Sequence, residues 1–295
     1  MMFSRRAAVL SLLSAAFPAG RAEAGEPFVL HPELAPMDAL RLPQRSVVLP
    51  TWRRNAVSVN VNDPRPKIAV VVDDMGATHP YTERVIALPG PLTLAWFPFA
   101  PNLPEQVQAA AARGHEALLH MPMQSYSNST YQTGPDPLRI DLPPEVNTAR
   151  LRAAIAAVPH IVGLNNHMGA VATLDPALMD IVAREASGHG MLFLDSVVIP
   201  HSQGLARAEV AGVPAAARDV FIDHTADPAM IAQQLTDIER IARRSGYAIA
   251  IGHPRLHTIE ALEWWLPGLA AKGFVLWPIA ATVALRNGMD VVLRA

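Results

Sequence analysis

The sequence contains no cysteine among its 295 residues, and only 17% of them are charged. Without cysteine the fold has no disulfide, and any metal ion must be held by histidine and carboxylate rather than thiolate. The 24 basic and 26 acidic residues leave a formal net charge of −2. Because this balance creates no broad basic field, nucleic acid is not an expected partner.

The sequence also lacks an internal repeat and a glycine-rich phosphate-binding loop. The stretches DDMGAT and GHPRLH do not have the glycine spacing that such a loop requires. Apolar residues, by contrast, make up 51% of the chain. This length and composition predict a globular protein with a sizeable core.

The start of the chain has the pattern of an export signal. Arginines 5 and 6 precede an apolar run over residues 7–19, and the triplet AEA at 22–24 resembles a cleavage site. The run is shorter than the roughly 20 residues that span a bilayer, which favours a signal peptide, residues 1–24, over a retained anchor. Both a twin-arginine and a general secretion signal fit. We predict an exported, periplasmic protein with no stable membrane span after cleavage.

Proline marks the next segment. Residues 25–66 hold seven prolines and little periodicity, which is typical of an extended linker or of a segment lying over a domain. From residue 67 onward, short apolar runs alternate with alanine-rich amphipathic stretches. We therefore predict a Pro-rich linker over 25–66 and a single domain over 67–295.

The apolar runs of this domain are predicted to be strands buried on both faces. Segments with helical spacing, such as 103–114 and 226–246, lie between most of them. This alternation is typical of an α/β fold with a parallel sheet, and seven or eight such units favour a barrel over an open sheet. The runs are KIAVVVDD, PLTLAWFPF, HEALLHMPM, IVGLNNH, MLFLDS, VFID, YAIAIGH and FVLWPI.

Several predicted strands end in residues that bind metals or move protons. In a parallel barrel all strand carboxyl ends lie on one face, where active sites are built. A single aspartate at a strand end is more often a helix cap or turn former, whereas a histidine there needs a ligand or hydrogen bond to offset its burial. These strand-end residues are Asp73, Asp74, His120, Asn165, Asn166, His167, Asp195, Asp223 and His253.

Asp73 and Asp74 are adjacent, although successive side chains of a regular strand point to opposite faces. Both reach the mouth of the barrel only if the pleat relaxes at the strand end. Two ionised carboxylates repel, and a divalent cation bound by one of them, with the other left as a base, resolves this conflict. One aspartate and two histidines suit Zn²⁺ with an open position for water, whose pKa such a site lowers to about 7.

Six segments of the domain carry a resemblance to a known family: IAVVVDDMG, GHEALLHMPMQ, GLNNHMGA, LFLDS, DVFID and AIGHPR. In this order they resemble the divergent polysaccharide deacetylases, exported bacterial proteins related to metal-dependent chitin and peptidoglycan deacetylases. The resemblance covers residue 67 to about the C-terminus. It implies an irregular (β/α)7–8 barrel and hydrolysis of N-acetyl or O-acetyl groups on a glycan.

The resemblance also implies roles for individual residues. In the wider family the first aspartate of the pair is the catalytic base and the second a metal ligand, which here makes Asp73 the base and Asp74 the ligand. The wider family then has two histidine ligands four residues apart, but this chain has His120 followed by Gln124. His167 is the best replacement, so the predicted zinc ligands are Asp74, His120 and His167.

The last family element is a strand-end histidine that protonates the leaving amine or alkoxide, and His253 occupies its place. The implied reaction is attack of a metal-activated water on the acetyl carbonyl, with Asp73 taking a proton and His253 giving one. Neighbours of these motifs are candidates for substrate binding: Asn165, Asn166, Asp195, Asp223 and Arg255.

Two rival functions stay open at this point. The histidine missing at position 124 motivates a catalytically inactive deacetylase-fold protein that binds a glycan or a cell-wall enzyme. A glycoside hydrolase would instead pair Asp73 with Asp195 or Asp223, about 5 to 10 Å apart across a sugar-sized cleft, but the clustered histidines make this less natural. The main prediction is a zinc-dependent deacetylase acting on a cell-envelope polysaccharide or peptidoglycan-type glycan.

Overall fold

The computed structural model describes residues 49–76, 81–126 and 133–291. The predicted signal peptide and residues 25–48 of the predicted linker lie outside the described residues. Within the described residues, no helix is both long enough and apolar enough to cross a membrane.

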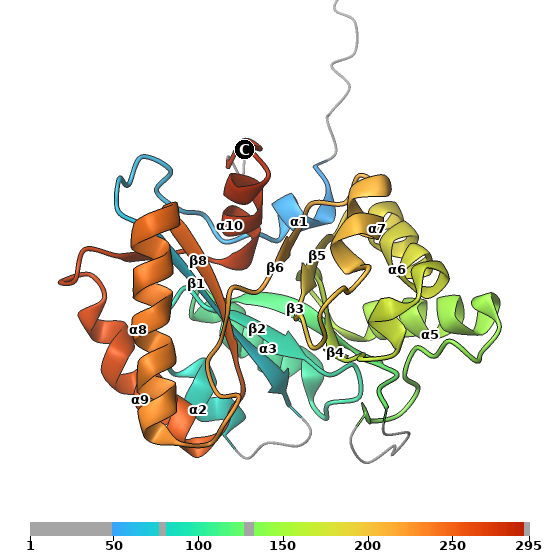
Figure 1. The fold of residues 1–295 in the computed structure, drawn as a ribbon, viewed down its shortest axis with the longest axis horizontal. Coiled ribbons are helices and arrows are strands. Elements are labelled where there is room, and N and C mark those ends of the chain that lie inside the picture. The colour runs from blue at the N-terminus through green and yellow to red at the C-terminus, as the bar shows by residue number, and fades with distance from the viewer. Residues whose placement is uncertain (1–48, 77–80, 127–132, 292–295) are drawn as a thin grey trace, which may run out of the picture. The chain divides into compact units, whose positions relative to one another are not determined.

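The strands of the described residues form one parallel sheet, in the order β6-β5-β4-β3-β2-β1-β8-β7 with β9 paired to β1 (Figure 1). Hydrogen-bonded ladders join each neighbouring pair in this order; for example, Val71 pairs with Thr93 on one side and with Ile251 on the other. The strands are β1 (Lys67–Met75), β2 (Thr93–Trp96), β3 (Glu116–Met123), β4 (Ile161–Met168), β5 (Leu192–Asp195), β6 (Ala215–Ala217), β7 (Val220–Phe221), β8 (Tyr247–Gly252) and β9 (Val275–Leu276).

The two ends of this strand order are joined by a very short link. Arg218 and Asp219 connect β6 directly to β7. The Arg218 N–H donates to the Asp195 carbonyl at 3.1 Å, and the Asp219 N–H donates to the Ile249 carbonyl at 2.8 Å. The sheet therefore curls back on itself, which confirms the predicted irregular barrel.

All eight predicted apolar runs contain a strand of this sheet. The sequence prediction missed only β6, a run of three alanines. Alanine has neither the bulk nor the branching that marks a buried strand, so this segment carried no local signal. β6 forms because it pairs with β5 over three residues.

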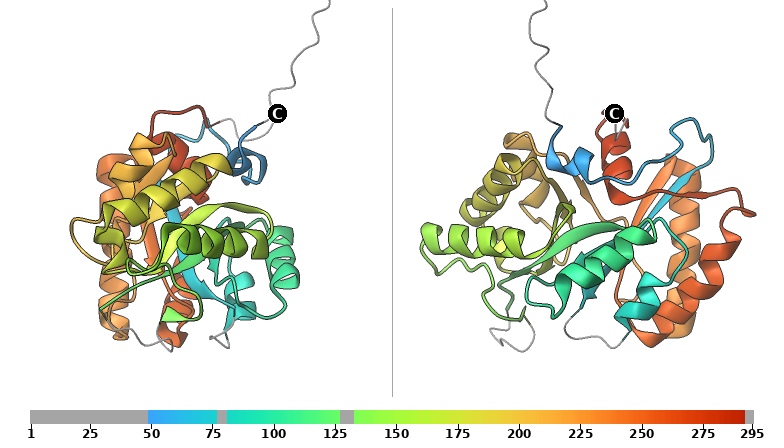
Figure 2. Two further views of the ribbon diagram at one scale, coloured as in Figure 1. Left: turned by 90° about the vertical axis from the view of Figure 1, so that its right-hand side faces the viewer. Right: turned by 180° about the vertical axis from the view of Figure 1, so that it is seen from behind.

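Helices cover the outside of the sheet (Figure 2). Two of them begin at aspartate caps: the Asp175 carboxylate accepts the Leu178 N–H at 2.7 Å, and the Asp227 carboxylate accepts the Ala229 N–H at 2.8 Å. The helices are α1 (Thr51–Arg54), α2 (Thr82–Ile86), α3 (Leu103–Ala112), α5 (Pro144–Ala157), α6 (Pro176–Gly188), α7 (Gly204–Val210), α8 (Pro228–Ser245), α9 (Leu256–Trp265) and α10 (Ile279–Arg286), with 3₁₀ turns η2 (Ala172–Leu174) and η3 (Leu266–Gly268).

The core has two parts because alternate strand residues face opposite sides of the sheet. Val70 and Val72 of β1 belong to the larger cluster, which also includes residues of the covering helices. Ala69 and Val71 belong to a smaller cluster inside the barrel. Helix α10 and Trp52 join this inner cluster and cover the amino ends of the strands.

The end of the proline-rich segment packs against the barrel. Trp52 is only 3% exposed, and its N–H donates to the Gly190 carbonyl at 2.9 Å. The Val57 N–H donates to the Glu116 carboxylate at 3.0 Å. Trp52 and Val57 thus attach this part of the chain to the barrel.

Candidate active site

The strand period carries polar side chains to the mouth of the barrel. The inner-facing series of β1 runs from Ala69 through Val71 to Asp73, because every second residue points inward. On β8 the same period leads from Ile251 to His253. The inner apolar core thus continues directly into titratable side chains at the carboxyl ends.

In a regular strand the Asp74 side chain would point to the opposite face from Asp73. A local irregularity in the strand turns it toward the same cavity. The pairing of β1 with β2 shifts register between Val72 and Met75, and Asp74 has a φ of 55°. Gly76 follows with a φ of 102°, where a side-chain Cβ would collide with Ala100. The pleat relaxes at the strand end, so both carboxylates face one cavity.

Three side chains at this cavity offer ligand atoms at nearly equal separations. Asp74 Oδ1 lies 3.1 Å from His120 Nε2 and 3.0 Å from His167 Nδ1, and the two nitrogens are 3.1 Å apart. Zinc ligands bound at 2.0–2.1 Å in tetrahedral geometry stand about 3.3 Å apart. The donor types and their spacing therefore fit a small divalent cation, and these three are the residues predicted as ligands.

Gln124 lies outside this cluster and supports the chain after β3. Its side-chain oxygen accepts the Ile140 N–H at 2.9 Å, and its own N–H donates to the Leu138 carbonyl at 2.8 Å. The neighbouring strand β4 pairs with β3 and carries His167. The donor atom that stands beside Asp74 and His120 thus comes from the next strand in the sheet rather than from position 124.

Asn165 orients two members of the site at once. Its amide nitrogen donates to Asp73 Oδ1 at 2.7 Å, so its amide oxygen accepts from His120 Nδ1 at 2.8 Å. The bond places the His120 proton on Nδ1 and turns the Nε2 lone pair toward Asp74 and His167. Such outer hydrogen bonds fix the tautomer and direction of a histidine ligand.

The charges around His120 favour a cation. Burial lowers the pKa of His120, but the carboxylates of Asp73 and Asp74 outweigh this effect and raise its pKa to about 9. A metal ion bound at Nε2 would take the place of that proton, because a histidine ligand must be neutral. The cluster therefore holds a positive charge, as a proton or as a metal ion.

Asp73 is 2% exposed and lies beside the ligand cluster. Burial raises the pKa of its carboxyl group, against the opposing effect of His120 and His253. A carboxylate whose proton affinity is raised in this way is a better base than an exposed one.

His253 is held by Asp223 on the opposite wall. His253 Nδ1 donates to Asp223 Oδ1 at 2.9 Å, while Asp223 Oδ2 accepts the His253 N–H and the Thr258 hydroxyl. Burial lowers the pKa of His253, but the hydrogen bond and charge of Asp223 raise it by a larger amount. The pKa of His253 is therefore raised overall. His253 Nε2 faces the site, 4.0 Å from Asp74 Oδ2. An imidazole with raised proton affinity is thus aimed at the cavity.

The cavity at this site has a volume of about 220 Å³. Asn166 and Arg255, two of the predicted substrate-binding residues, line it together with the two carboxylates and three histidines described above. Sequence reasoning missed Ser196, Arg218 and Phe221 on its wall. Arg218 directly follows the alanine strand β6. Because that strand was not predicted, Arg218 could not be recognised as a residue at a strand end.

Three other predicted substrate-binding residues, Asn165, Asp195 and Asp223, are not part of the cavity wall. Asp195 accepts the Val197 N–H at 2.8 Å and the Ser202 hydroxyl at 2.7 Å. All three side chains are buried, and their hydrogen bonds are made with protein partners. Their contacts fit positioning of loops and ligands rather than contact with substrate.

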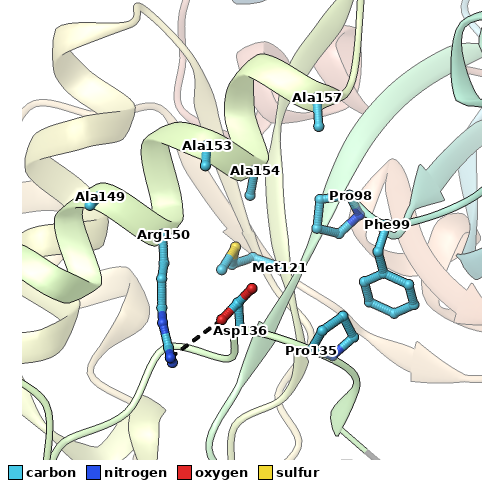
Figure 3. Close-up of a pocket in the computed structure, with 10 residues that line it drawn as sticks. All are labelled: Pro98, Phe99, Met121, Pro135, Asp136, Ala149, Arg150, Ala153, Ala154 and Ala157. Carbon is cyan, nitrogen blue, oxygen red and sulfur yellow. Dashed lines mark ion pairs between the residues drawn. The ribbon is translucent and has the colours of Figure 1, made fainter.

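A larger cavity of about 390 Å³ lies next to the site, on the outer face of β3 (Figure 3). Alanines of α5 and the side chain of Met121 line it, with an ion pair between Arg150 and Asp136 at 3.4 Å. Phe99 on its wall stacks on Phe97, whose ring packs against His120 and His167. The described residues place no metal-ligand cluster in this second cavity.

Comparison with known proteins agrees with this fold. A family model described as divergent polysaccharide deacetylase matches residues 70–283. The uncharacterised Escherichia coli K12 protein YibQ is 34% identical over 197 residues, which cover 67% of this chain and 61% of YibQ. An uncharacterised Haemophilus influenzae protein is 34% identical over 203 residues, covering 69% of this chain and 72% of that protein. The chain thus spans about three fifths of the length of YibQ.

A crystal structure has a similar fold. That of an uncharacterised protein from Agrobacterium tumefaciens C58 superposes with a TM-score of 0.76 at 27% identity, covering 79% of this chain and 95% of that one.

Proposed function

The chain belongs to the divergent polysaccharide deacetylase family, and we propose that it is a metal-dependent hydrolase that removes acetyl groups from a cell-envelope polysaccharide. One observation carries this proposal: Asp74, His120 and His167 present three ligand atoms 3.0–3.1 Å apart beside a buried carboxylate and a carboxylate-bound histidine. Asp73 and His253 are the base and acid that hydrolysis of an amide or ester requires.

Asp74, His120 and His167 would hold the metal, with Zn²⁺ as the ion best suited to one carboxylate and two imidazoles. When bound, the ion supplies an acidified water and electrostatic stabilisation of an oxyanion. Asn165 keeps the Nδ1 proton of His120 in place and holds the Asp73 carboxylate at the same time. One side chain, Asn165, therefore orients both a metal ligand and the base.

Asp73 accepts a proton at its carboxylate as the acetyl carbonyl is attacked. Its raised pKa favours this transfer, because a base is more effective when its proton affinity approaches the working pH. His253 gives its Nε2 proton to the departing sugar nitrogen or oxygen. Asp223 supports this step because its ionised carboxylate stabilises the imidazolium before the transfer and orients the ring.

We place the protein in the periplasm, on the pattern of residues 1–24, and its substrate among the glycans of the envelope. The alternative of an inactive glycan-binding protein rests on the missing histidine at position 124. His167 on the adjacent strand offers the donor that this position lacks, so the geometry favours the hydrolase.

The test is the metal content of the purified protein by mass spectrometry, without a metal-binding affinity tag. Asp74→Ala, His120→Ala and His167→Ala should each lose near-stoichiometric zinc, while the exposed His257→Ala should retain it. Acetate release from peptidoglycan and chitin fragments should follow zinc content. No bound metal after zinc is added back would contradict the hydrolase and favour the inactive binding protein.

A further inference from the structure

Two guanidinium groups line the cavity and take no part in the proton transfers above. Arg218 lies in the link between β6 and β7, and Arg255 follows His253 by two residues. Arg218 donates to the carbonyl oxygens of Ser196 at 2.8 Å and Val197 at 2.9 Å. Both arginines are thus placed by the ends of strands that build the site.

Backbone carbonyls hold these guanidinium groups without cancelling their charge. Arg255 Nη1 donates to the Asp223 carbonyl oxygen at 2.8 Å. Among the described residues, neither Arg218 nor Arg255 has a carboxylate oxygen within 4.0 Å. A guanidinium has five N–H donors in a planar fork that matches a carboxylate or phosphate. The bonds to carbonyl oxygens leave part of each fork for a ligand.

The charge of the wall becomes positive once a divalent cation is bound. The wall contains two carboxylates, Asp73 and Asp74, and the two guanidinium groups. A divalent cation offsets both carboxylates, so the guanidinium charges remain. An oxyanion of the substrate is the natural counter-charge, because charge-assisted hydrogen bonds to a guanidinium are strong and directional.

More distant carboxylates reduce this positive charge without reversing it. Arg218 interacts at longer range with Asp73, which the cation already offsets, and with Asp195 and Asp219. Asp219 is already paired with Arg286 at 3.4 Å, and Asp223 is paired with His253 at 2.9 Å. Asp195 therefore offsets at most one of the two guanidinium charges. The wall therefore keeps a net positive charge on this side.

Both arginines lie on the side of the cavity that holds His253. The Arg218 guanidinium stacks on the ring of Phe221, 4.7 Å from its centroid, and that ring lies 5.4 Å from His253. Arg255 is bonded to Asp223, the partner of His253. The proton donor faces the sugar that leaves, so the two guanidinium groups face that sugar as well.

We propose that the glycan carries an anionic group, a carboxylate or a phosphate, on the sugar that bears the acetyl group, and that Arg218 and Arg255 bind it. The proposal rests on the proposed function in taking a glycan as the occupant of this cavity. It adds a substrate class: an acidic acetylated sugar rather than a neutral one.

The test compares ligands that differ only in the anionic group. The first pair is a disaccharide of N-acetylglucosamine and N-acetylmuramic acid, with its carboxylate free or converted to a carboxamide. The second pair is N-acetylglucosamine 6-phosphate and N-acetylglucosamine. Dissociation constants are measured by calorimetry on the full chain with added zinc, in an Asp73→Asn background that prevents turnover.

We expect an anionic ligand to bind about tenfold or more tightly than its neutral counterpart. Arg255→Gln, at an exposed position, should remove most of this preference and change the affinity for the neutral ligand less than about twofold. Arg218→Lys keeps the charge but loses the fork, so it should weaken the preference without removing it. Arg150→Gln, in the outer cavity, is the matched control and should leave the preference intact.

A preference for phosphate alone, or for the carboxylate alone, supports the proposal and identifies the anion. Equal affinities within both ligand pairs would overturn it, as would a preference that survives both Arg255→Gln and Arg218→Lys unchanged. Zinc content is measured on the same samples. An arginine-dependent preference without bound zinc would refute the hydrolase and keep this inference. Zinc-dependent acetate release by the wild-type chain, with no anion preference in the binding measurements, would refute this inference and keep the hydrolase.

Discussion

The two ends of the barrel each bury a carboxyl group, and the surroundings of these groups differ. Glu116, at the amino end of β3, is 2% exposed and accepts the N–H groups of Val57 and Ala280, each at 3.0 Å. Asp73, near the carboxyl end of β1, is also 2% exposed, but its hydrogen bond at 2.7 Å comes from the Asn165 side chain.

The two carboxyl groups differ in whether the groups around them can exchange protons. The N–H groups bonded to Glu116 belong to the N-terminal segment and to the start of α10, so the carboxyl group joins three separate parts of the chain. Backbone donors do not titrate. Asp73 faces histidines that exchange protons and a cavity that admits a ligand. At one end the buried carboxyl group connects segments of the chain, and at the other end it lies beside a cavity and groups that can exchange protons.

The largest expected effect follows from removing the charge of Asp73. Asp73→Asn should lower the rate of acetate release about 10²- to 10⁴-fold, because a general base contributes that much. Zinc content and thermal stability should stay close to those of the wild type, since the amide fills the same space. Activity within twofold of the wild type would show that Asp73 is not the base.

The second prediction concerns pH and Glu116. Burial raises the pKa of Glu116 from 4.5 to about 7, against the opposing effect of the N–H groups bonded to it. Between these values only the folded state keeps the proton, so the free energy of unfolding should fall as pH rises and level off above 7. Each tenfold change in proton affinity is worth about 1.4 kcal/mol, so the loss should approach about 3 kcal/mol. Urea denaturation from pH 4.5 to 8 measures it.

Glu116→Gln isolates this contribution from other titrating groups. The variant should lose that part of the slope, and it should be less stable by about 1–3 kcal/mol at low pH, because its NH₂ group cannot accept one of the N–H bonds. Zinc content should not change. A slope equal to that of the wild type would show that Glu116 does not titrate in this range.

A smaller effect is expected at Asn165, which touches the site without lining it. Asn165→Ala should lower zinc affinity about 10- to 100-fold, because loss of an outer hydrogen bond frees the orientation of His120. Competition with a chelator measures this affinity. Asn147→Ala provides the control: Asn147 is buried on α5 and bonded to the Arg139 backbone, so its loss should reduce stability and leave zinc affinity unchanged.

The smallest effect is expected in the outer cavity. Asp136→Asn removes the ion pair with Arg150, in which the aspartate side chain is 78% exposed, and asparagine tolerates the φ of 50° at this position. Exposed pairs contribute little, so the free energy of unfolding should change by less than about 1 kcal/mol. Acetate release should be unaltered, and a large loss of activity would show that this cavity takes part in substrate binding.

Much of the fold could be predicted from local patterns. Eight apolar runs marked eight strands, because a strand buried on both faces needs apolar residues at every position. Strand β6 could not be predicted in this way, since its three alanines do not form a recognisable apolar run. Its position depends on pairing with β5, a contact that no short stretch of sequence reveals.

The grouping of Asp73, Asp74, His120, His167 and His253 also followed from the sequence, because parallel strands bring their carboxyl ends to one face. The family resemblance, which the family match confirms, supplied their individual roles as predictions. Neither the strand pattern nor the family resemblance gives the distances between these side chains.

The hydrogen bonds that organise the site were decided only in three dimensions. Asn165 and Asp73 are 92 positions apart in the chain, and His253 and Asp223 are 30 apart, yet each pair is in direct contact. The register shift that turns Asp74 inward is likewise a property of the pairing of β1 with its neighbour. Side-chain period is local and readable in sequence, whereas partners across a barrel depend on how all strands pack together.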